Sequence, residues 1–340
     1  LPYLHEMGVD YLYLNPIFEA HSNHRYNTAD YLNVDPLLGT NEDFETLCKE
    51  AAKYGIGIVL DGVFSHTGSD SRYFNREGRY GEGGAYRDPN SPYRSWYDFD
   101  PKYKGGYRSW WGFETLPEVN EETPSFVEFI TGKGGVIDTW LRRGAAGFRL
   151  DVADELPDAF IEKIRAAVKR VSPEKFLLGE VWEDATTKYG FGHRRTYLLG
   201  KGLDSVMNYP FKNAVLDFVK GKPAQQAMNE ILSICEHYPT PALNTALNFL
   251  STHDTERALT VIADEPANGR GREWQSSRNV SGEAYEEGML RLRMAYAIIY
   301  TLPGLPCLYY GDEIGMQGYR DPFNRGYYCW DSHEERLKPV

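Results

Sequence analysis

The chain has 340 residues, 41% of them hydrophobic, and a formal net charge of −12. This length suffices for one large barrel or two ordinary domains. The negative charge argues against a nucleic-acid partner, and no apolar run of about 18 residues could cross a membrane. The four cysteines form no C-x-x-C pair and no cluster with histidine, which is typical of a reducing compartment, and we expect a cytoplasmic protein.

The first third of the chain predicts alternating helices and strands. Residues 1–7 have the pattern of a helix end. Thr40 and Asp43 form a capping-box pattern at the start of a helix over 40–54, whose apolar residues recur at helical spacing. Strands are predicted at 9–14 and 56–60.

Residues 67–123 break this alternation. They are rich in Gly, Tyr, Trp, Arg and Pro and contain no long periodic segment. A structureless loop of this size is uncommon inside a compact domain. We therefore interpret 67–123 as a small inserted domain that follows the third strand of the fold.

The alternation resumes after the insert. Helices are predicted over 125–143 (interrupted by glycines), over 158–171, within 211–237 and near 283–301. Strands are predicted at 146–150, 176–179, 203–207, 248–253 and 306–310.

Seven strands that alternate with helices indicate βαβ units and a parallel sheet. We expect an α/β fold, a (β/α)8 TIM barrel formed by residues 1–66 and 124–340, from which the insert grows. Only seven strands are predicted, and no helix is predicted after the last one. We therefore expect the first strand and the last helix of the barrel to be missing from this chain.

Three predicted strands are followed by a lone carboxylate: Asp151, Glu180 and Asp254. A parallel barrel collects such residues at one rim, and glycoside cleavage needs two carboxyl groups that flank the scissile bond. Asp151 is the candidate nucleophile because Arg149, two residues earlier, points to the same side and would keep it ionised. Glu180 has apolar neighbours and is the candidate acid. Taken singly, each acid has an ordinary structural alternative, such as a helix cap.

Two histidines fall at the same predicted rim. His66 follows the strand at 56–60, and His253 precedes Asp254. Either could be a satisfied core histidine, or could donate hydrogen bonds to sugar hydroxyls. Neither has the i, i+4 partner of a helical zinc site, which argues against catalytic zinc.

Four segments carry these acids in order, and two more flank them. They are DGVFSH at 61–66, GFRLDVADE at 147–155, GEVW at 179–182 and FLSTHD at 249–254, with flanking segments at 13–18 and 302–313. Through them, nearly the whole chain resembles the α-amylase family of retaining glycoside hydrolases.

The resemblance implies Asp151 as nucleophile, Glu180 as acid/base and Asp254 as stabiliser of the transition state. It also implies that the insert is the family's small domain. The substrate-binding residues that it implies are Tyr26, His66, Arg149 and His253, with Asp61 as the acid that orients the arginine.

Within the family, the chain is most similar to the neopullulanase, cyclomaltodextrinase and maltogenic amylase group, because of the segment at 207–210 and the acidic pair Asp154-Glu155. Three further residues are predicted to contact substrate: Glu155, Trp182 and Arg325. Glu155 could equally be a helix-start acid, and Arg325 a loop-stabilising ion pair.

We therefore expect retaining hydrolysis of α-1,4-glucosidic bonds in maltooligosaccharides, cyclodextrins or pullulan. The alternatives are an α-1,6-glucosidase or glucosyl-transferring relative and, from another class, a catalytically silent carbohydrate-binding subunit. No cofactor is expected for the chemistry, and a structural calcium ion is left open. An additional N-terminal domain of the kind found in this group would favour a homodimer.

Overall fold

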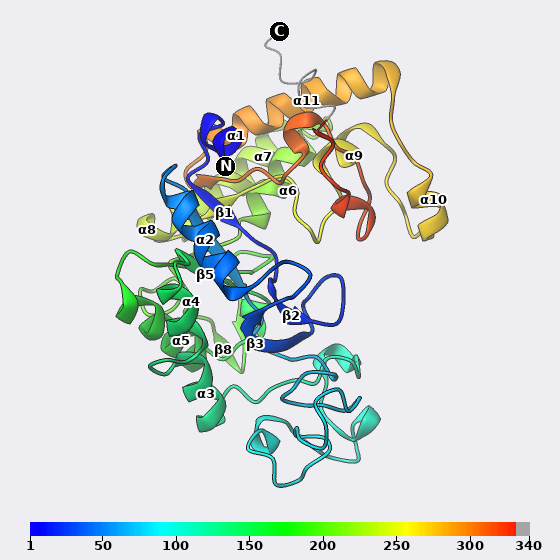
Figure 1. The fold of residues 1–340 in the computed structure, drawn as a ribbon. Helices are drawn as coiled ribbons and strands as arrows, with labels where there is room; N and C mark the ends of the chain where they lie inside the picture. The colour runs from blue at the N-terminus through cyan, green and yellow to red at the C-terminus, as the bar shows by residue number, and fades with distance from the viewer. Residues whose placement is uncertain (331–340) are drawn as a thin grey trace. The chain divides into compact units, whose positions relative to one another are not determined.

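The computed structural model describes residues 1–330, which divide into two units (Figure 1). The first unit comprises Leu1–Glu180 and Tyr189–Asp204. The second comprises Val181–Lys188 and the described residues from Ser205 onward. The boundary between the units therefore falls directly after Glu180, one of the predicted catalytic residues.

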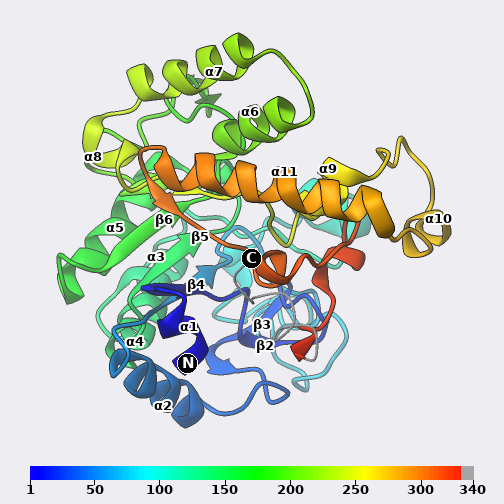
Figure 2. The ribbon, with the colours of Figure 1, turned by 90° about the horizontal axis from the view of Figure 1, so that it is seen from above.

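The first unit is built on a parallel sheet. Asp61 of one strand lies opposite Arg149 of the next. Backbone pairing continues one residue beyond two of the strands, because Asp151 N–H donates to Gly62 O at 3.1 Å and Glu180 N–H donates to Leu150 O at 3.0 Å. The predicted catalytic side chains of this unit thus emerge at the carboxyl ends of neighbouring strands. In order across the sheet, the strands are β1 (Tyr11–Tyr13), β4 (Gly57–Gly62), β5 (Gly147–Leu150) and β6 (Phe176–Gly179) (Figure 2).

Helices follow these strands much as the sequence predicts. The capping box of Thr40 and Asp43 is formed, and it begins the second helix. Gly134, with φ of +75°, separates the third helix from the fourth. The fifth helix turns an apolar face inward at i, i+3 and i+4 spacing. The helices of this unit are α1 (Pro2–Glu6), α2 (Asn41–Ala52), α3 (Pro124–Thr131), α4 (Val136–Arg142) and α5 (Asp158–Val171).

An antiparallel hairpin that the sequence did not predict packs on this framework through Trp140. The Trp140 ring is fully buried, 4.9 Å from the Phe18 ring and 5.2 Å from the Phe44 ring between centroids. Its Nε1–H donates to Tyr31 O at 2.7 Å, so the indole is satisfied inside the core. The hairpin strands are β2 (Phe18–Ala20) and β3 (Thr28–Val34), and a second short hairpin joins β7 (Tyr189–Gly190) to β8 (His193–Arg194).

Residues 67–123 contain short 3-10 helices and isolated antiparallel bridges, such as Tyr97 to Val119 and Ser109 to Pro117, but no α-helix and no longer strand. The two ends of the segment are tied together, because Thr67 N–H donates to Pro117 O and Val119 N–H donates to Ser65 O. Its status as a separate inserted domain stays a prediction. The 3-10 helices are η1 (Arg94–Trp96), η2 (Lys104–Gly106) and η3 (Trp110–Gly112).

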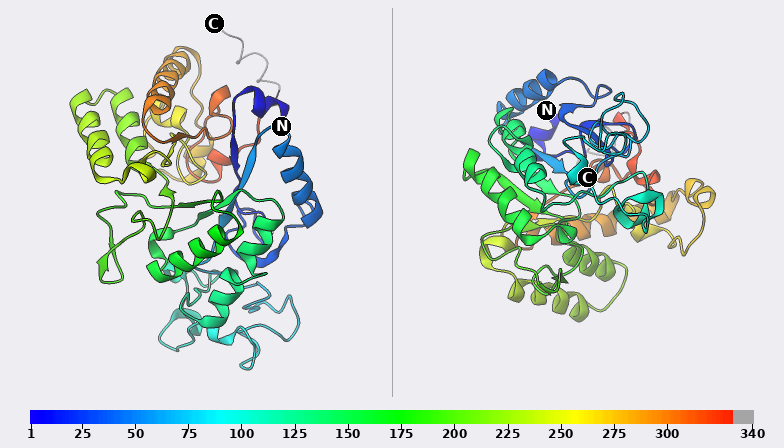
Figure 3. Two further views of the ribbon diagram at one scale, coloured as in Figure 1. Left: turned by 90° about the vertical axis from the view of Figure 1, so that its left-hand side faces the viewer. Right: turned by 90° about the horizontal axis from the view of Figure 1, so that it is seen from below.

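The second unit is mainly helical. Helix α6 packs against α7 and α11, and α11 also packs against α9 (Figure 3). None of the helices in residues 1–330 is both long and apolar enough to cross a membrane. The elements are β9 (Ser205–Val206), α6 (Tyr209–Val219), α7 (Ala224–His237), α8 (Thr240–Leu243), β10 (Leu247–Asn248), α9 (Ala258–Ala263), α10 (Arg272–Ser276), α11 (Gly282–Thr301), β11 (Leu305–Pro306), η5 (Asp312–Ile314) and η6 (Phe323–Arg325).

Two strands predicted for this unit are mostly wrong in extent. The strand predicted at 248–253 ends at Asn248, and the strand predicted at 306–310 ends at Pro306. Beyond these points, side chains replace the ladder as backbone partners. Arg257 Nη1 donates to Tyr310 O at 2.7 Å, for example, and Gly311 turns the chain with φ of +86°.

Candidate active site

Arg149 on β5 is the centre of the site in the first unit. Its side chain is fully buried, and Nη1 lies 2.9 Å from both Asp61 Oδ1 and Asp151 Oδ1. Nη2 lies 2.8 Å from Glu180 Oε2. Burial alone would lower the pKa of Arg149. The negative charges of Asp61 and Glu180 raise it by more than burial lowers it, so the pKa lies well above its ordinary value. One permanent cation thus stabilises three buried carboxylates.

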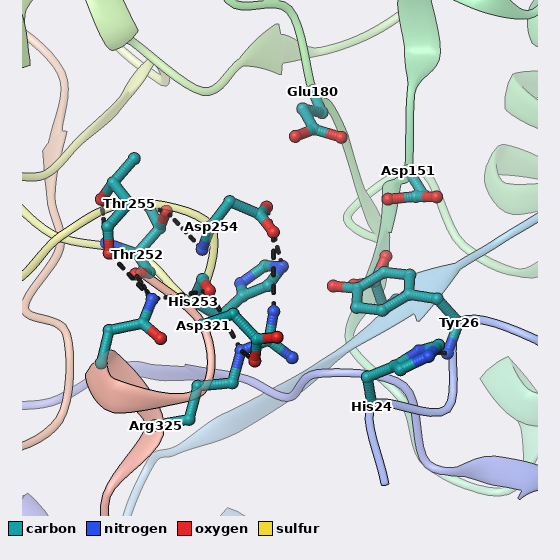
Figure 4. A network of polar contacts seen from close by, with 12 residues as sticks. His24, Tyr26, Asp151, Glu180, Thr252, His253, Asp254, Thr255, Asp321 and Arg325 are labelled. Atoms are coloured by element: carbon teal, nitrogen blue, oxygen red, sulfur yellow. Dashed lines mark hydrogen bonds and ion pairs between the residues drawn. The ribbon is translucent and has the colours of Figure 1, made fainter. Parts of the chain in front are cut away.

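Two tyrosines converge on Asp61. The Tyr13 and Tyr26 hydroxyls donate to Asp61 Oδ2 at 2.7 Å and 2.9 Å. Burial raises the pKa of both phenols well above the ordinary value of 10.0, and Asp61 adds to both shifts, so both remain donors. His24 stacks on Tyr26 with ring centroids 6.2 Å apart (Figure 4). The sequence analysis did not select Tyr13, although it lies at the end of β1.

His66 contacts the backbone of Tyr26. Its Nε2 lies 3.1 Å from Tyr26 O, and Nδ1 lies 2.9 Å from Ser65 Oγ. Because a carbonyl oxygen can only accept, Nε2 carries the proton and Nδ1 accepts from the hydroxyl. Burial lowers the pKa of His66 to about 4. The histidine is therefore neutral near pH 7.

A strained turn follows β5 and contacts Glu180. Val152 has φ of 41° and ψ of 47°, a left-handed conformation that is rare for a β-branched residue and costs on the order of 1–3 kcal/mol. In this conformation Val152 N–H donates to Glu180 Oε2 at 2.9 Å. The sequence offers no signal for this strain.

Glu155 lies at the end of the same turn, in the 3-10 helix η4 (Ala153–Glu155). Its carboxylate accepts hydrogen bonds from the indole nitrogens of Trp110 and Trp111, at 2.7 Å and 2.8 Å. Its observed partners are therefore two tryptophans of the 67–123 segment, which the sequence analysis did not select.

In the second unit, Asp254 follows β10 in a turn. Its Oδ2 lies 3.0 Å from His253 Nε2, and its Oδ1 lies 3.7 Å from Arg325 Nη2 (Figure 4). Arg325 Nε also lies 3.1 Å from His253 O and 3.0 Å from Asp321 Oδ1. These contacts support the alternative in which Arg325 stabilises the loop. The contact of Arg325 with sugar stays a prediction.

Asn324 holds this turn, and the sequence analysis gave it no role. Its Nδ2 lies 2.7 Å from His253 O and 2.8 Å from Thr255 O, and the residue is fully buried. Asp254 N–H in turn donates to Thr252 Oγ1 at 3.2 Å. These bonds satisfy backbone groups that a longer β10 would have paired.

Trp182 is 44% exposed and lies on Tyr209, with ring centroids 4.1 Å apart and an interplanar angle of 15°. It lines a hollow of about 540 Å³ in the second unit, together with Asn213 of α6 and residues of α7. An exposed indole beside polar side chains is a suitable surface for a sugar ring, and this role of Trp182 stays a prediction.

The first unit thus brings together six of the residues predicted from the sequence, and the second brings together three. Their meeting in one site stays a prediction. No group of three or more His, Cys, Asp and Glu side chains in residues 1–330 is arranged to hold a metal ion. The first six are Tyr26, Asp61, His66, Arg149, Asp151 and Glu180, and the other three are His253, Asp254 and Arg325.

Relatives of this chain are named for α-glucan substrates. It is 37% identical over 376 residues to the amylopullulanase of Thermoanaerobacter thermohydrosulfuricus, covering 99% of this chain and 24% of that protein. It is 34% identical over 344 residues to neopullulanase 2 of Thermoactinomyces vulgaris, covering 98% of this chain and 52% of that protein. The chain therefore spans about a quarter to a half of these relatives.

Solved structures give the same result. The ligand-free cyclic α-maltosyl-(1→6)-maltose hydrolase of Arthrobacter globiformis has a TM-score of 0.80 at 29% identity, over 98% of this chain and 68% of that one. The type III pullulan hydrolase of Thermococcus kodakarensis has a TM-score of 0.82 at 29% identity, over 99% and 55%. The prediction of a TIM-barrel-like fold is confirmed; the missing strand and helix stay predictions.

A family match covers almost the whole chain. The family described as "Alpha amylase, catalytic domain" matches residues 1–337. The relatives include a cyclomaltodextrinase and a maltogenic α-amylase beside the neopullulanase, so the predicted grouping is confirmed as well. The chain belongs to the α-amylase catalytic-domain family.

Proposed function

We propose that the chain is the catalytic part of a retaining glycoside hydrolase that cleaves α-1,4-glucosidic bonds in maltooligosaccharides, cyclodextrins or pullulan. The observation that carries this proposal is the buried guanidinium of Arg149, which holds the carboxylates of Asp151 and Glu180 at 2.9 Å and 2.8 Å. A double displacement at an anomeric carbon requires two carboxyl groups that flank the scissile bond, and Asp151 and Glu180 directly follow the neighbouring strands β5 and β6.

In the first step, Asp151 attacks the anomeric carbon while Glu180 gives its proton to the glycosidic oxygen. The C–O bond breaks, the leaving sugar departs as an alcohol, and a glucosyl–Asp151 ester remains. In the second step, Glu180 takes a proton from water, the hydroxide forms a new bond to the anomeric carbon, and Asp151 leaves as a carboxylate. Two inversions retain the α configuration.

The contacts of Asp151 suit its role, and those of Glu180 distinguish its two oxygens. Arg149 favours the charged form of Asp151, which a nucleophile needs. Both Val152 N–H and Arg149 Nη2 contact Oε2 of Glu180. The hydrogen bond from Val152 N–H and the positive charge of Arg149 beside Oε2 favour the proton on Oε1, so we assign Oε1 as the oxygen that protonates the leaving group.

The other predicted residues are assigned to substrate binding on the family resemblance. We propose Asp254 as the third carboxylate, which stabilises positive charge in the transition state. The neutral imidazole of His66 and the ring of Tyr26 are proposed to contact the sugar at the cleavage position, with Asp61 orienting Arg149. His253, Arg325 and Trp182 are proposed to bind further hydroxyls and rings. A cytoplasmic location and dimerisation through an additional domain stay predictions.

Asp151→Asn and Glu180→Gln test the proposal. Reducing-sugar release from maltotriose and cyclodextrin should fall at least about a thousandfold in each, because each removes a group that reacts. Circular dichroism should remain unchanged, since both substitutions keep the side-chain shape. Asp100→Asn, which changes an exposed aspartate paired with Lys102, is the control and should keep full activity. Near-wild-type turnover by Asp151→Asn would refute the nucleophile assignment.

Cleavage of α-1,6 bonds is a second candidate. It is favoured by the names of the amylopullulanase and of the cyclic α-maltosyl-(1→6)-maltose hydrolase. Product analysis separates the candidates, because α-1,4 cleavage of pullulan gives panose or isopanose, whereas α-1,6 cleavage gives maltotriose. Absence of any product from pullulan, maltotriose and cyclodextrin would instead indicate the catalytically silent alternative.

A further inference from the structure

The carboxylate of Glu155 binds two neighbouring tryptophans at once. Oε2 accepts from Trp110 Nε1 at 2.7 Å, and Oε1 accepts from Trp111 Nε1 at 2.8 Å. A carboxylate that accepts one bond on each oxygen fixes the orientation of both indoles. The Trp110 ring also lies 5.4 Å from the ring of His66, a predicted substrate-binding residue.

The backbone at Trp111 is held against its own preference. Trp111 has φ of 51° and ψ of 24°, and Gly112 follows with φ of 78°. Phe113 N–H donates to Trp110 O at 2.9 Å, which closes a tight turn with two consecutive left-handed residues. Asn or Gly is usual at the first of these positions, and a bulky residue there is an outlier. Trp111 is therefore held in a strained backbone conformation, and such strain is found mainly at functional sites.

Trp111 is 77% exposed although its only polar atom is already satisfied. An indole that is oriented by a hydrogen bond at one edge and open on its face is a preformed apolar surface. The face of a pyranose ring, with its axial C–H groups, is the flat apolar ligand that such a surface fits. Trp111 is therefore ordered in advance, and little conformational entropy remains to be lost when a ligand binds.

The turn at Val152 connects the support of this indole to the proposed catalytic acid, Glu180. Val152, three residues before Glu155, donates its N–H to Glu180 Oε2. The short 3-10 helix η4 leads from this bond to the carboxylate that holds Trp111. We propose that Trp111 is a binding platform for a glucose unit of the α-glucan other than the one cleaved, and that Glu155 is the positioning residue that holds the platform. This inference rests on the proposed function.

Calorimetric titration in the Asp151→Asn background, where the sugar is not consumed, tests the platform. Trp111→Ala should bind maltohexaose about tenfold more weakly, by the loss of one stacking partner. Its unfolding midpoint should not change, because the ring is exposed. Tyr11→Ala is the matched control, since Tyr11 is a 57% exposed aromatic residue at the amino end of β1, and it should bind like the parent. Equal maltohexaose binding by Trp111→Ala would overturn the inference. A change in self-association with unchanged sugar binding would overturn it too, because the exposed indole would then contact protein.

A double-mutant cycle tests the role of Glu155. Glu155→Ala frees both indoles and should weaken maltohexaose binding about as much as Trp111→Ala. The double variant should lose clearly less than the sum of the two single losses, because a positioning residue acts partly through the Trp111 ring that it holds. Glu155→Gln keeps one acceptor oxygen and should fall between. Additive losses would overturn the positioning role and indicate direct contact of Glu155 with sugar.

Failure of the inference can be told apart from failure of the proposed function. If the wild-type protein releases sugar from maltohexaose and Trp111→Ala binds it equally well, the platform is wrong and the hydrolase proposal stands. If the wild-type protein neither binds nor cleaves α-glucans, the proposed function is wrong and the platform falls with it.

Discussion

Replacing Arg149 by methionine removes a cation that contacts Asp61, Asp151 and Glu180 at once. Methionine keeps much of the length and volume of the side chain, so the change is mainly electrostatic. The three carboxylate contacts are 2.8–2.9 Å long, and the carboxylate residues are 2%, 8% and 4% exposed. Methionine supplies neither a charge nor a donor in place of the guanidinium, so the three buried carboxyl groups would face one another without this cation.

The expected loss follows from these distances. One ion pair at about 3 Å is worth roughly 5 kcal/mol of Coulomb energy at an effective dielectric constant of about 20. The cost of removing the guanidinium from water offsets part of this Coulomb energy. Breaking a buried pair by removing one partner costs about 3–5 kcal/mol in practice. We expect Arg149→Met to lose this much free energy of unfolding at neutral pH.

Urea unfolding followed by circular dichroism measures this loss by linear extrapolation. Lys53→Met is the matched control, because Lys53 and Glu50 form a surface pair at 2.6 Å with side chains that are 65% and 47% exposed. The control should lose no more than about 1 kcal/mol. The reasoning would be refuted if Arg149→Met lost less than about 1 kcal/mol at neutral pH, or no more than the control.

Two further predictions concern buried groups. The pKa of His66 falls from its ordinary 6.5 to about 4 on burial, so only the unfolded chain takes up this proton between those values. The free energy of unfolding therefore falls by about 3 kcal/mol through His66 as the pH falls from about 6.5 to about 4. His66→Gln removes the titrating group and should flatten that part of the curve of stability against pH. Arg257 and Asp312 form a buried pair at 3.1 Å, so Arg257→Met should lower the free energy of unfolding by about 3–5 kcal/mol, and Arg257→Met/Asp312→Leu should recover much of it. A double variant no more stable than the single one would contradict this account.

The helices and the order of the strands could be predicted because local patterns determine them. The capping box at Thr40 and the apolar periodicity over 158–171 both correspond to observed helices with nearly the predicted bounds. The lengths of the last strands could not be predicted. They depend on Arg257 and Asn324, whose side chains reach backbone carbonyls more than 50 residues away in the sequence.

The positions of Asp151 and Glu180 could be predicted because each directly follows a strand of one parallel sheet. Asp254 lies six residues beyond the end of β10, and its place in the same site stays a prediction. Their partners could not be derived in the same way. Tyr13 contacts Asp61 across 48 residues, and Glu155 contacts Trp111 across 44. The strain at Val152 has no sequence signature, because valine is a residue that normally avoids this conformation.

The anomeric configuration of the first product tests the proposed mechanism most directly. Proton NMR, recorded within the first turnovers on maltotriose and before mutarotation, distinguishes the α from the β anomer at the newly formed reducing end. Attack by Asp151 followed by attack of water predicts the α anomer. Release of the β anomer first would contradict a glucosyl–Asp151 intermediate and with it the roles assigned to both carboxylates.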